Sequence, residues 1–160
     1  MADQIIDGYI NAWLVPVIPN IAAPVAATVA AGIAIELLLI FEGLQGLEST
    51  TNWVNNSALG STFDTQLPGT VGYGDMSLEF KWQAGTDTLF GLLVFGYQTN
   101  LVIRTGYLRS TAIAAGQSPL EVYPITCGQY TRTAYERNSL RRFKVPIGLS
   151  SEPNLRAVAA

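Results

Sequence analysis

The sequence predicts a mainly β domain with one short α-helix packed against a sheet, and three observations support this fold class. Residues 76–82 alternate apolar and polar side chains, which is the period of a strand with one buried and one solvated face. Residues 142–149 alternate in the same way. Residues 87–94 carry a short helical pattern between extended segments. A single short helix in a chain rich in turns favours a sheet with that helix laid on one face.

The strongest predicted strand is Met76–Trp82, whose alternate residues, beginning with the first, are all apolar. The alternation then ends, and Thr86 or Asp87 can accept hydrogen bonds from the free amides of a following turn. We therefore expect a helix from this point to Val94, ended by Gly96.

Three further strands are expected in the second half of the chain. Residues 101–104 are rich in β-branched side chains, which favour extended backbone. Residues 120–125 form the next strand, in which Pro124 lacks a backbone donor and so indicates a sheet edge or a bulge. Residues 142–149 form the last, with Phe143, Val145 and the following alternate residues on its buried face.

The composition favours an assembled protein over a free monomer. A chain of 160 residues suits one domain, and 49 % of its residues are apolar. Charged residues make up only 13 %, so we expect neighbouring subunits to cover much of the surface. With one cysteine, Cys127, and no histidine, the chain offers no intramolecular disulfide and no Cys-His or Ser-His catalytic pair. We expect no enzymatic activity, no metal site and no cofactor.

The charges are unevenly distributed along the chain. No Lys or Arg precedes Lys81, whereas acidic residues occur from Asp3 to Asp75. After that point, cations outnumber carboxylates. Two interpretations remain open: both sets are solvated faces, or complementary halves of adjacent copies meet.

Residues 1–20 are predicted to form an N-terminal docking arm. They carry acidic residues where a secretory signal would carry basic ones, so we do not interpret them as a signal peptide. Pro16 and Pro19 favour extended backbone. The domain itself is expected at 21–155, followed by a short C-terminal tail at 156–160.

Residues 21–41 form a long apolar run whose length, about 20 residues, could span a bilayer. Pro24, Gly32 and Glu36 interrupt it, and no Lys or Arg lies near either end to orient a span. A small membrane or channel-like protein with a span near 21–41 is therefore the alternative function. We prefer an interrupted apolar segment with a short strand near 33–41.

Residues 41–61 are predicted to form a long loop, because glycines and polar turn-forming residues dominate this stretch. Residues 63–73 contain Pro68 and two glycines, and we expect them to lead by a turn into the strand that follows. Residues 70–75 spell TVGYGD, the selectivity filter of potassium channels, whose carbonyls replace the hydration shell of the ion. Such a filter needs a pore helix before it, and Pro68 occupies that position, so we interpret the match as coincidence.

Several short segments occur in a characteristic order and spacing. They are NSALGSTFDT at 56–65, SLEFK at 77–81, GTDT at 85–88, EVYPITCG at 121–128, VPI at 145–147 and SEPN at 151–154. Together they resemble the major tail protein, or tail tube protein, of long-tailed, non-contractile phages that infect actinobacteria, and the likeness covers nearly the whole chain. The resemblance implies a β-sandwich or barrel-like tail tube fold with one flanking short helix and extended arms.

The resemblance also implies a function, that of a structural subunit in a siphovirus tail tube. Such subunits polymerise as stacked rings, with six copies in each ring, around a channel through which DNA passes during genome ejection. The implied partners are copies of the same chain, other tail proteins at the tube ends and transient, non-specific DNA in the lumen, with no membrane. The implied location is the virion, after synthesis in the host cytoplasm. We expect the arm at 1–20 and the loop at 41–61 to join neighbouring subunits.

Two sets of candidate site residues follow from this role. A lumen wall should repel DNA weakly, so Glu79 is the best lumen candidate, with Glu121 behind it and Lys81 paired to a carboxylate or near the rim. Equally, Glu79 and Lys81 could pair across the sheet on an outer face. The subunit-interface candidates are apolar side chains of the arm and the loop: Ile5, Ile6, Tyr9, Trp13, Leu44, Leu47 and Trp53.

Overall fold

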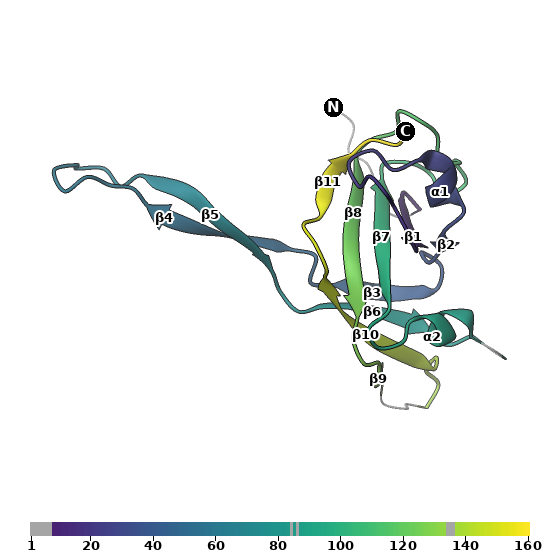
Figure 1. Cartoon of the computed structure of the whole chain (residues 1–160). Coiled ribbons are helices and arrows are strands. Elements are labelled where there is room, and N and C mark those ends of the chain that lie inside the picture. The colour runs from purple at the N-terminus through teal and green to yellow at the C-terminus, as the bar shows by residue number, and fades with distance from the viewer. Residues whose placement is uncertain (1–7, 84, 86, 134–136) are drawn as a thin grey trace.

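The computed structural model describes residues 8–83, 85, 87–133 and 137–160, and this part of the chain folds mainly as antiparallel sheet (Figure 1). The two helices are short and lie at the periphery. In chain order the elements are β1 (Ile10–Val15), α1 (Ala26–Ala30), β2 (Ile33–Ala34), β3 (Leu39–Gln45), β4 (Ser49–Asn55), β5 (Gln66–Tyr73), β6 (Met76–Lys81), α2 (Thr88–Leu92), β7 (Gln98–Thr105), β8 (Leu120–Cys127), β9 (Thr131–Arg132), β10 (Arg142–Leu149) and β11 (Asn154–Ala157).

The main sheet runs in the order β2-β1-β7-β8-β10-β6-β3, with β11 paired to β8 and β9 paired to β10. Strand β10 pairs with β8 only at Ile147–Leu149, whereas it pairs with β6 from Arg142 to Ile147. Because β10 belongs to β8 at one end and to β6 along most of its length, the sheet curls into a half-barrel (Figure 1). The predicted mainly β, barrel-like fold class is confirmed, with two short helices where one was expected.

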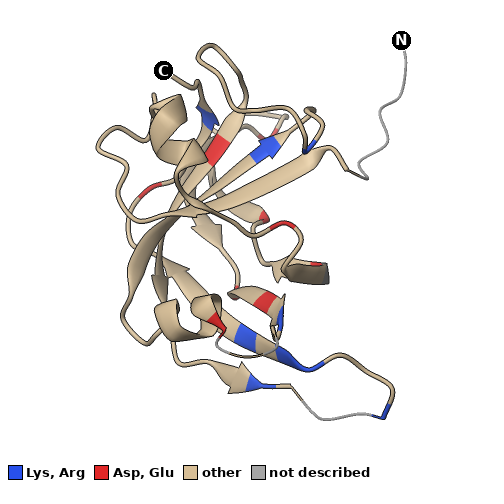
Figure 2. Cartoon of the chain, turned by 90° about the vertical axis from the view of Figure 1, so that its right-hand side faces the viewer, with Lys and Arg blue, Asp and Glu red and all other residues tan. Residues whose placement is uncertain are grey.

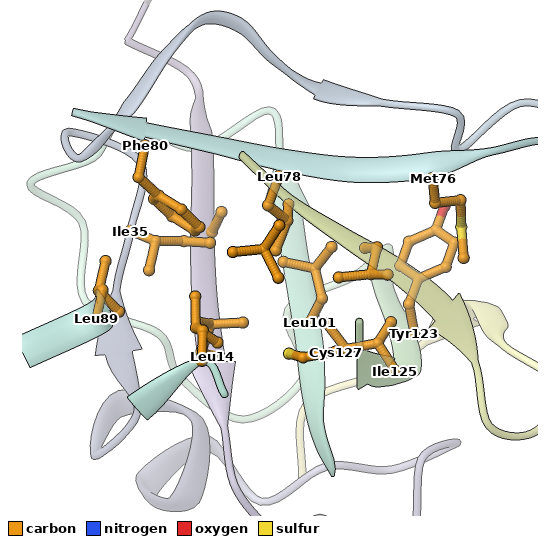
Figure 3. Packing of buried hydrophobic residues seen from close by; sticks show 14 of the residues in the cluster. Leu14, Ile35, Met76, Leu78, Phe80, Leu89, Leu101, Tyr123, Ile125 and Cys127 are labelled. Atoms are coloured by element: carbon orange, nitrogen blue, oxygen red, sulfur yellow. The ribbon is translucent and has the colours of Figure 1, made fainter. Parts of the chain in front are cut away.

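The main hydrophobic core lies inside the curl of the half-barrel. Figure 3 shows Met76, Leu78 and Phe80 of β6 pointing toward Leu14 of β1, Leu101 of β7 and the residues of β8. Each fully buried aliphatic or aromatic side chain of this kind contributes about 1.5–3 kcal/mol relative to an exposed one. The curl is therefore held by side chains from both halves of the sheet.

A second, smaller cluster lies on the opposite face of β1, β7 and β8. It contains Val15, Val102 and Val122, which are covered by Val29 of α1 and by Ala157 of β11. Strand β7 is consequently buried on both faces, which explains its uninterrupted apolar run.

The strongest sequence predictions are confirmed by the structure. The strands expected near 76–82, 101–104, 120–125 and 142–149 are β6, β7, β8 and β10. Helix α2 begins directly after Asp87, whose carboxylate accepts hydrogen bonds from Phe90 N at 3.0 Å and Gln83 N at 2.9 Å. The helix ends at Leu92, two residues earlier than predicted.

The structure differs from the expectation of an N-terminal docking arm at 10–15. These residues form β1, an internal strand between β2 and β7, and Asn11 and Leu14 are each 1 % exposed. The partners that bury them are residues 100–105, far away in the sequence, so local patterns could not indicate them. Residues 1–7, including Ile5 and Ile6, lie outside the described residues.

Three segments expected to be irregular are regular in the structure. The predicted loop at 41–61 contains most of β3 and all of β4, and the predicted turn at 63–73 contains β5. Pro68 is tolerated in β5 because that strand pairs only with β4 among the described elements, which leaves its other edge free of ladder hydrogen bonds. The expected tail at 156–160 includes the last two residues of β11, and Ala157 and Ala159 are buried.

Pro124 illustrates how the interior of the sheet accommodates a proline. Of the two predicted alternatives for Pro124, an edge or a bulge, the edge is wrong because strand β8 is internal; the strand instead changes partner along its length. Residues 120–122 lie opposite β11, and residues 125–127 lie opposite β10. Pro124 falls between these two partners, so its missing N–H removes no ladder hydrogen bond on that side.

Candidate functional site

The β4–β5 hairpin projects far from the half-barrel (Figure 1). Its strands pair from Ser49 opposite Tyr73 at the root to Asn55 opposite Gln66 near the tip. Along the ribbon, Asn52 Nδ2 donates a hydrogen bond to Thr70 Oγ1 at 3.0 Å. No third strand pairs with this hairpin in the described part of the chain.

Both faces of the hairpin expose large apolar side chains. On β4, Trp53 is 60 % exposed and Val54 is 57 % exposed, and adjacent residues of a strand point to opposite faces. On β5 and at the tip, Leu67, Val71, Leu59 and Phe63 are also exposed. Asp64 is the single charged residue in the stretch 49–73. A lone two-stranded ribbon is marginally stable, and clustered exposed apolar surface marks an interaction site.

A groove of about 790 Å³ lies between the root of the hairpin and the link from β10 to β11. The ring of Tyr73 lines it and packs edge-on against Tyr123, with 6.3 Å between ring centroids. Burial raises the pKa of Tyr73, and the nearby carboxylates Glu121 and Glu152 raise it further. The root is thus anchored to the body by a neutral aromatic contact.

The outer face of β6 and β10 carries Glu79 and Lys81, as the alternation predicted. Arg142 Nη1 lies 3.6 Å from Glu79 Oε1, and Thr133 Oγ1 donates to the same oxygen at 3.3 Å. Lys81 Nζ donates to the carbonyl of Leu37 at 3.3 Å. The two candidates therefore lie on one face but do not pair with each other, because each has another partner.

Glu121 lies on a different face from Glu79. The hydroxyl of Tyr123 donates to Glu121 Oε2 at 2.9 Å, and the Tyr123 side chain belongs to the main core inside the curl. Burial, followed by the contact with Glu121, raises the pKa of Tyr123. The structure does not bring the three lumen candidates onto one wall of the molecule.

The buried thiol of Cys127 has low reactivity. Its side chain packs in the main core and is 2 % exposed, and burial raises its pKa from 9.0 to about 11. A thiol in this environment stays protonated and is a poor nucleophile.

The apolar run at 21–41 forms α1, β2 and the first part of β3. Among the described residues, no helix combines the length and apolar character needed to cross a membrane. The channel-like string at 70–75 begins on the exposed strand β5 of the hairpin.

The model of one family, described as phage tail tube protein, matches residues 1–160. This chain belongs to that family. As a phage tail component, the tail tube protein is part of the virion. A search of curated protein sequences finds no match.

Three solved structures share this fold. A chain of the anti-feeding prophage baseplate, solved with 6-fold symmetry, is 12 % identical, with a TM-score of 0.59 and 96 % of both chains covered. A chain from the sheath/tube terminator of PVC, an extracellular contractile injection system, is 10 % identical, with a TM-score of 0.62, and 96 % of this chain and 97 % of that one are covered. A chain from the tube-terminating cap of the anti-feeding prophage is 9 % identical, with a TM-score of 0.57, and 92 % and 87 % are covered. At these identities the likeness establishes the fold alone.

The interface candidates of the tail tube protein occupy different environments. Trp53 is exposed on the hairpin, whereas Leu44 and Leu47 are half-buried and pack against the main core. Trp13 is half-buried, and the centroid of its ring lies 5.3 Å from Cζ of the Arg104 guanidinium. Tyr9 is half-buried at the start of β1. Of the described candidates, Trp53 offers the most free apolar surface.

Sequence reasoning missed the rest of the hairpin surface. Val54, Leu67 and Val71 share the exposure of Trp53, as do Leu59 and Phe63 at the tip. One signal could have found them, because residues 49–73 combine β-branched and aromatic residues with a single charge, which is unusual for a solvated loop.

Proposed function

We propose that this tail tube protein polymerises with itself as stacked rings around a channel, and that the β4–β5 hairpin is its main docking element. The observation that carries the proposal is the uncovered apolar surface on both faces of the hairpin. A neighbouring copy that covers Trp53, Leu67 and Val71 would remove this surface from water, at about 25 cal/mol per Å² of apolar area. The low charge content of the chain supports the same conclusion.

The finer parts of the proposal concern the assembled tail. We propose rings of six copies, other tail proteins at the tube ends, and passage of DNA through the lumen during genome ejection. The 6-fold symmetry of the related baseplate supports the ring size. Assignment to a long-tailed, non-contractile phage of actinobacteria, with synthesis in the host cytoplasm, rests on the collinear segments described above; the related PVC terminator belongs to a contractile system.

The lumen wall remains a prediction for Glu79, Lys81 and Glu121. The rationale of a weakly acidic wall fits β6 poorly, because Glu79 is paired to Arg142 and lies opposite Lys144. A map of the assembled tube, with the residues of the bore identified, tests this assignment directly.

The proposed docking role is tested by exposed substitutions that spare the body. Trp53→Ser combined with Leu67→Ser should leave a folded protein that forms few or no tubes in negative-stain electron micrographs. The matched control is Val17→Ser with Phe95→Ser, which removes two apolar side chains of the body that are even more exposed than Trp53 and Leu67, at 69 % and 76 %. Normal tubes from the hairpin variant, or equal loss in the control, would contradict the role of the hairpin.

A further inference from the structure

Positive charge gathers at one end of the half-barrel. Six of the nine Lys and Arg residues lie on β6, on β9, on β10 and in the loop before β10, and Figure 2 shows these segments together, below the rest of the molecule. We call this surface the basic end. It consists of Lys81, Arg132, Arg137, Arg141, Arg142 and Lys144.

Among the described residues, the arginines of the basic end are only partly neutralised. Arg142 pairs with Glu79 at 3.6 Å, and it is the sole ion pair among the described residues. The guanidinium of Arg141 stacks on Trp82 with Cζ 3.8 Å from the ring centroid, which holds its charge at the surface. Arg132 and Arg141 line a narrow cleft with Trp82 and further aromatic rings. Fixed arginines of this kind present donors that suit carboxylates.

Negative charge gathers in a groove elsewhere on the chain. We call it the acidic groove; it has a volume of about 650 Å³ and lies between the end of β3 and the start of β8. Glu42, Glu48 and Glu121 line it, and none of the described lining residues is a cation. Glu42 and Glu48 are exposed. Glu152 lies near Glu121, since both raise the pKa of Tyr73.

The strand register separates most of the basic end from the acidic groove. On β6, Lys81 of the basic end lies opposite Arg142, whereas the groove adjoins the other end of β6, where Ser77 is opposite Gln45. Lys144 lies between the two surfaces, and its Nζ donates to Gln45 Oε1 of the groove at 3.3 Å. A strand of this length spans about 20 Å, so Arg132 and Arg141, which lie beside Phe143 and Trp82, are left to contact a neighbouring copy.

We propose that the basic end of one copy docks on the acidic groove of a second copy. The contact joins two different surfaces of identical chains, so it repeats from copy to copy, and it closes into a ring or continues as a stack according to the rotation between copies. Complementary charges would set the register and orientation of this contact and exclude wrong pairings. The inference deepens the proposed function and rests on it, since it names a second surface that the polymer uses besides the hairpin.

A nucleic acid is the other class of partner that a basic surface can attract. The second copy is favoured because the same chain carries an acidic groove whose lining carboxylates form no ion pair among the described residues. DNA binding at the basic end leaves Glu42 and Glu48 without a role, whereas self-docking accounts for both surfaces.

Charge reversal tests the contact. One variant carries Arg132→Glu and Arg141→Glu, a second carries Glu42→Lys and Glu48→Lys, and a third combines all four changes. Each double variant should lower the assembled fraction, measured by sedimentation and electron microscopy, by about tenfold or more, because like charges then meet. Both an equal mixture of the two double variants and the fourfold variant should restore assembly, because opposite charges meet again. Arg156→Glu with Val17→Glu and Val25→Glu, at exposed positions outside both surfaces, has the same net charge as the first variant and should assemble normally.

The outcomes separate this inference from the proposed function. If the wild type assembles and neither the mixture nor the fourfold variant is rescued, the contact between the two surfaces is refuted while self-assembly stands. If the arginine variant assembles normally but loses binding to a labelled double-stranded oligonucleotide in an anisotropy assay, the basic end binds DNA instead. If the wild type forms no assemblies from about 0.1 M to about 1 M NaCl, over which the Debye length falls from about 10 Å to about 3 Å, both proposals fail.

Discussion

The β4–β5 hairpin and the β7–β8 pair are both antiparallel ladders of long strands, yet they differ completely in burial. From Thr99 to Arg104 every residue of β7 is buried, whereas in β5 every residue before Tyr73 is exposed. Backbone pairing is similar in the two ladders, so the difference lies in what covers their faces. The β7–β8 pair has a cluster of the chain's own side chains on each face, whereas among the described residues the hairpin packs against such a cluster only through Tyr73 at its root.

This comparison indicates where stability and assembly reside. Substitutions in β7 should change the free energy of unfolding of the single subunit, because its contacts are complete within the chain. Substitutions in the hairpin should leave that free energy nearly unchanged and act on association instead, because the partners that we propose for it lie in another copy. The following substitutions test this division between the stability of the single subunit and its association with other copies.

The comparison is tested most directly by the same substitution in both ladders. Leu101→Ala removes a side chain that is fully buried, so it should lower the free energy of unfolding by about 2–5 kcal/mol. Leu67→Ala removes a side chain that is 53 % exposed, and its effect should stay within about 0.5 kcal/mol. Urea denaturation of unassembled protein gives both values. Equal losses in the two variants would contradict the division.

The buried polar end of β7 should show the next largest effect. Arg104 is fully buried, donates to Gln117 Oε1 at 2.7 Å and to Thr111 O at 2.6 Å, and stacks between Trp13 and Tyr107. Arg104→Met should therefore cost about 3 kcal/mol, since both acceptors lose a charged donor. Arg156→Met, at an exposed cation, is the control and should have little effect in the same denaturation experiment. A loss of less than about 1 kcal/mol would show that these contacts are dispensable.

The cap of α2 should contribute less. Asp87→Ala removes an acceptor that serves two backbone amides, and we expect a loss of about 1–2 kcal/mol in the free energy of unfolding. Asp87→Asn keeps an acceptor oxygen and should recover much of this loss. If the two variants prove equally destabilised, the capping hydrogen bonds are not the cause.

The last prediction concerns alkaline pH. Burial raises the pKa of Cys127 from 9.0 in the unfolded chain to about 11 in the folded one, so the folded state holds this proton more tightly. The resulting stability is complete below pH 9.0 and is lost as the pH rises toward about 11. Denaturation across this range, compared with Cys127→Ala, isolates the contribution of the thiol. An identical pH dependence in the two proteins would show that the thiol contributes nothing.

Side-chain period alone was enough to predict the elements that have one buried and one solvated face. Strands β6 and β10 keep a strict alternation because one side of each faces the core and the other carries Glu79, Lys81 and Lys144. The start of α2 could also be predicted from the sequence, because Asp87 caps the helix through hydrogen bonds to residues only three and four positions away. The charge asymmetry of the sequence allowed complementary surfaces on adjacent copies as one of two interpretations, and that interpretation stays a prediction.

Tertiary structure decided the elements whose partners lie far away or outside the chain. Strand β1 looked like a free arm because its partner, β7, comes 90 residues later, as Asn11 opposite Arg104 shows. The hairpin looked like a loop because neither of its faces packs on the body, so no alternation distinguishes an inner from an outer side. Period 2 arises only where burial differs between the two faces of a strand. The sequence therefore determined the core-facing strands, and the folded chain alone determined which apolar residues of the candidate site are left uncovered.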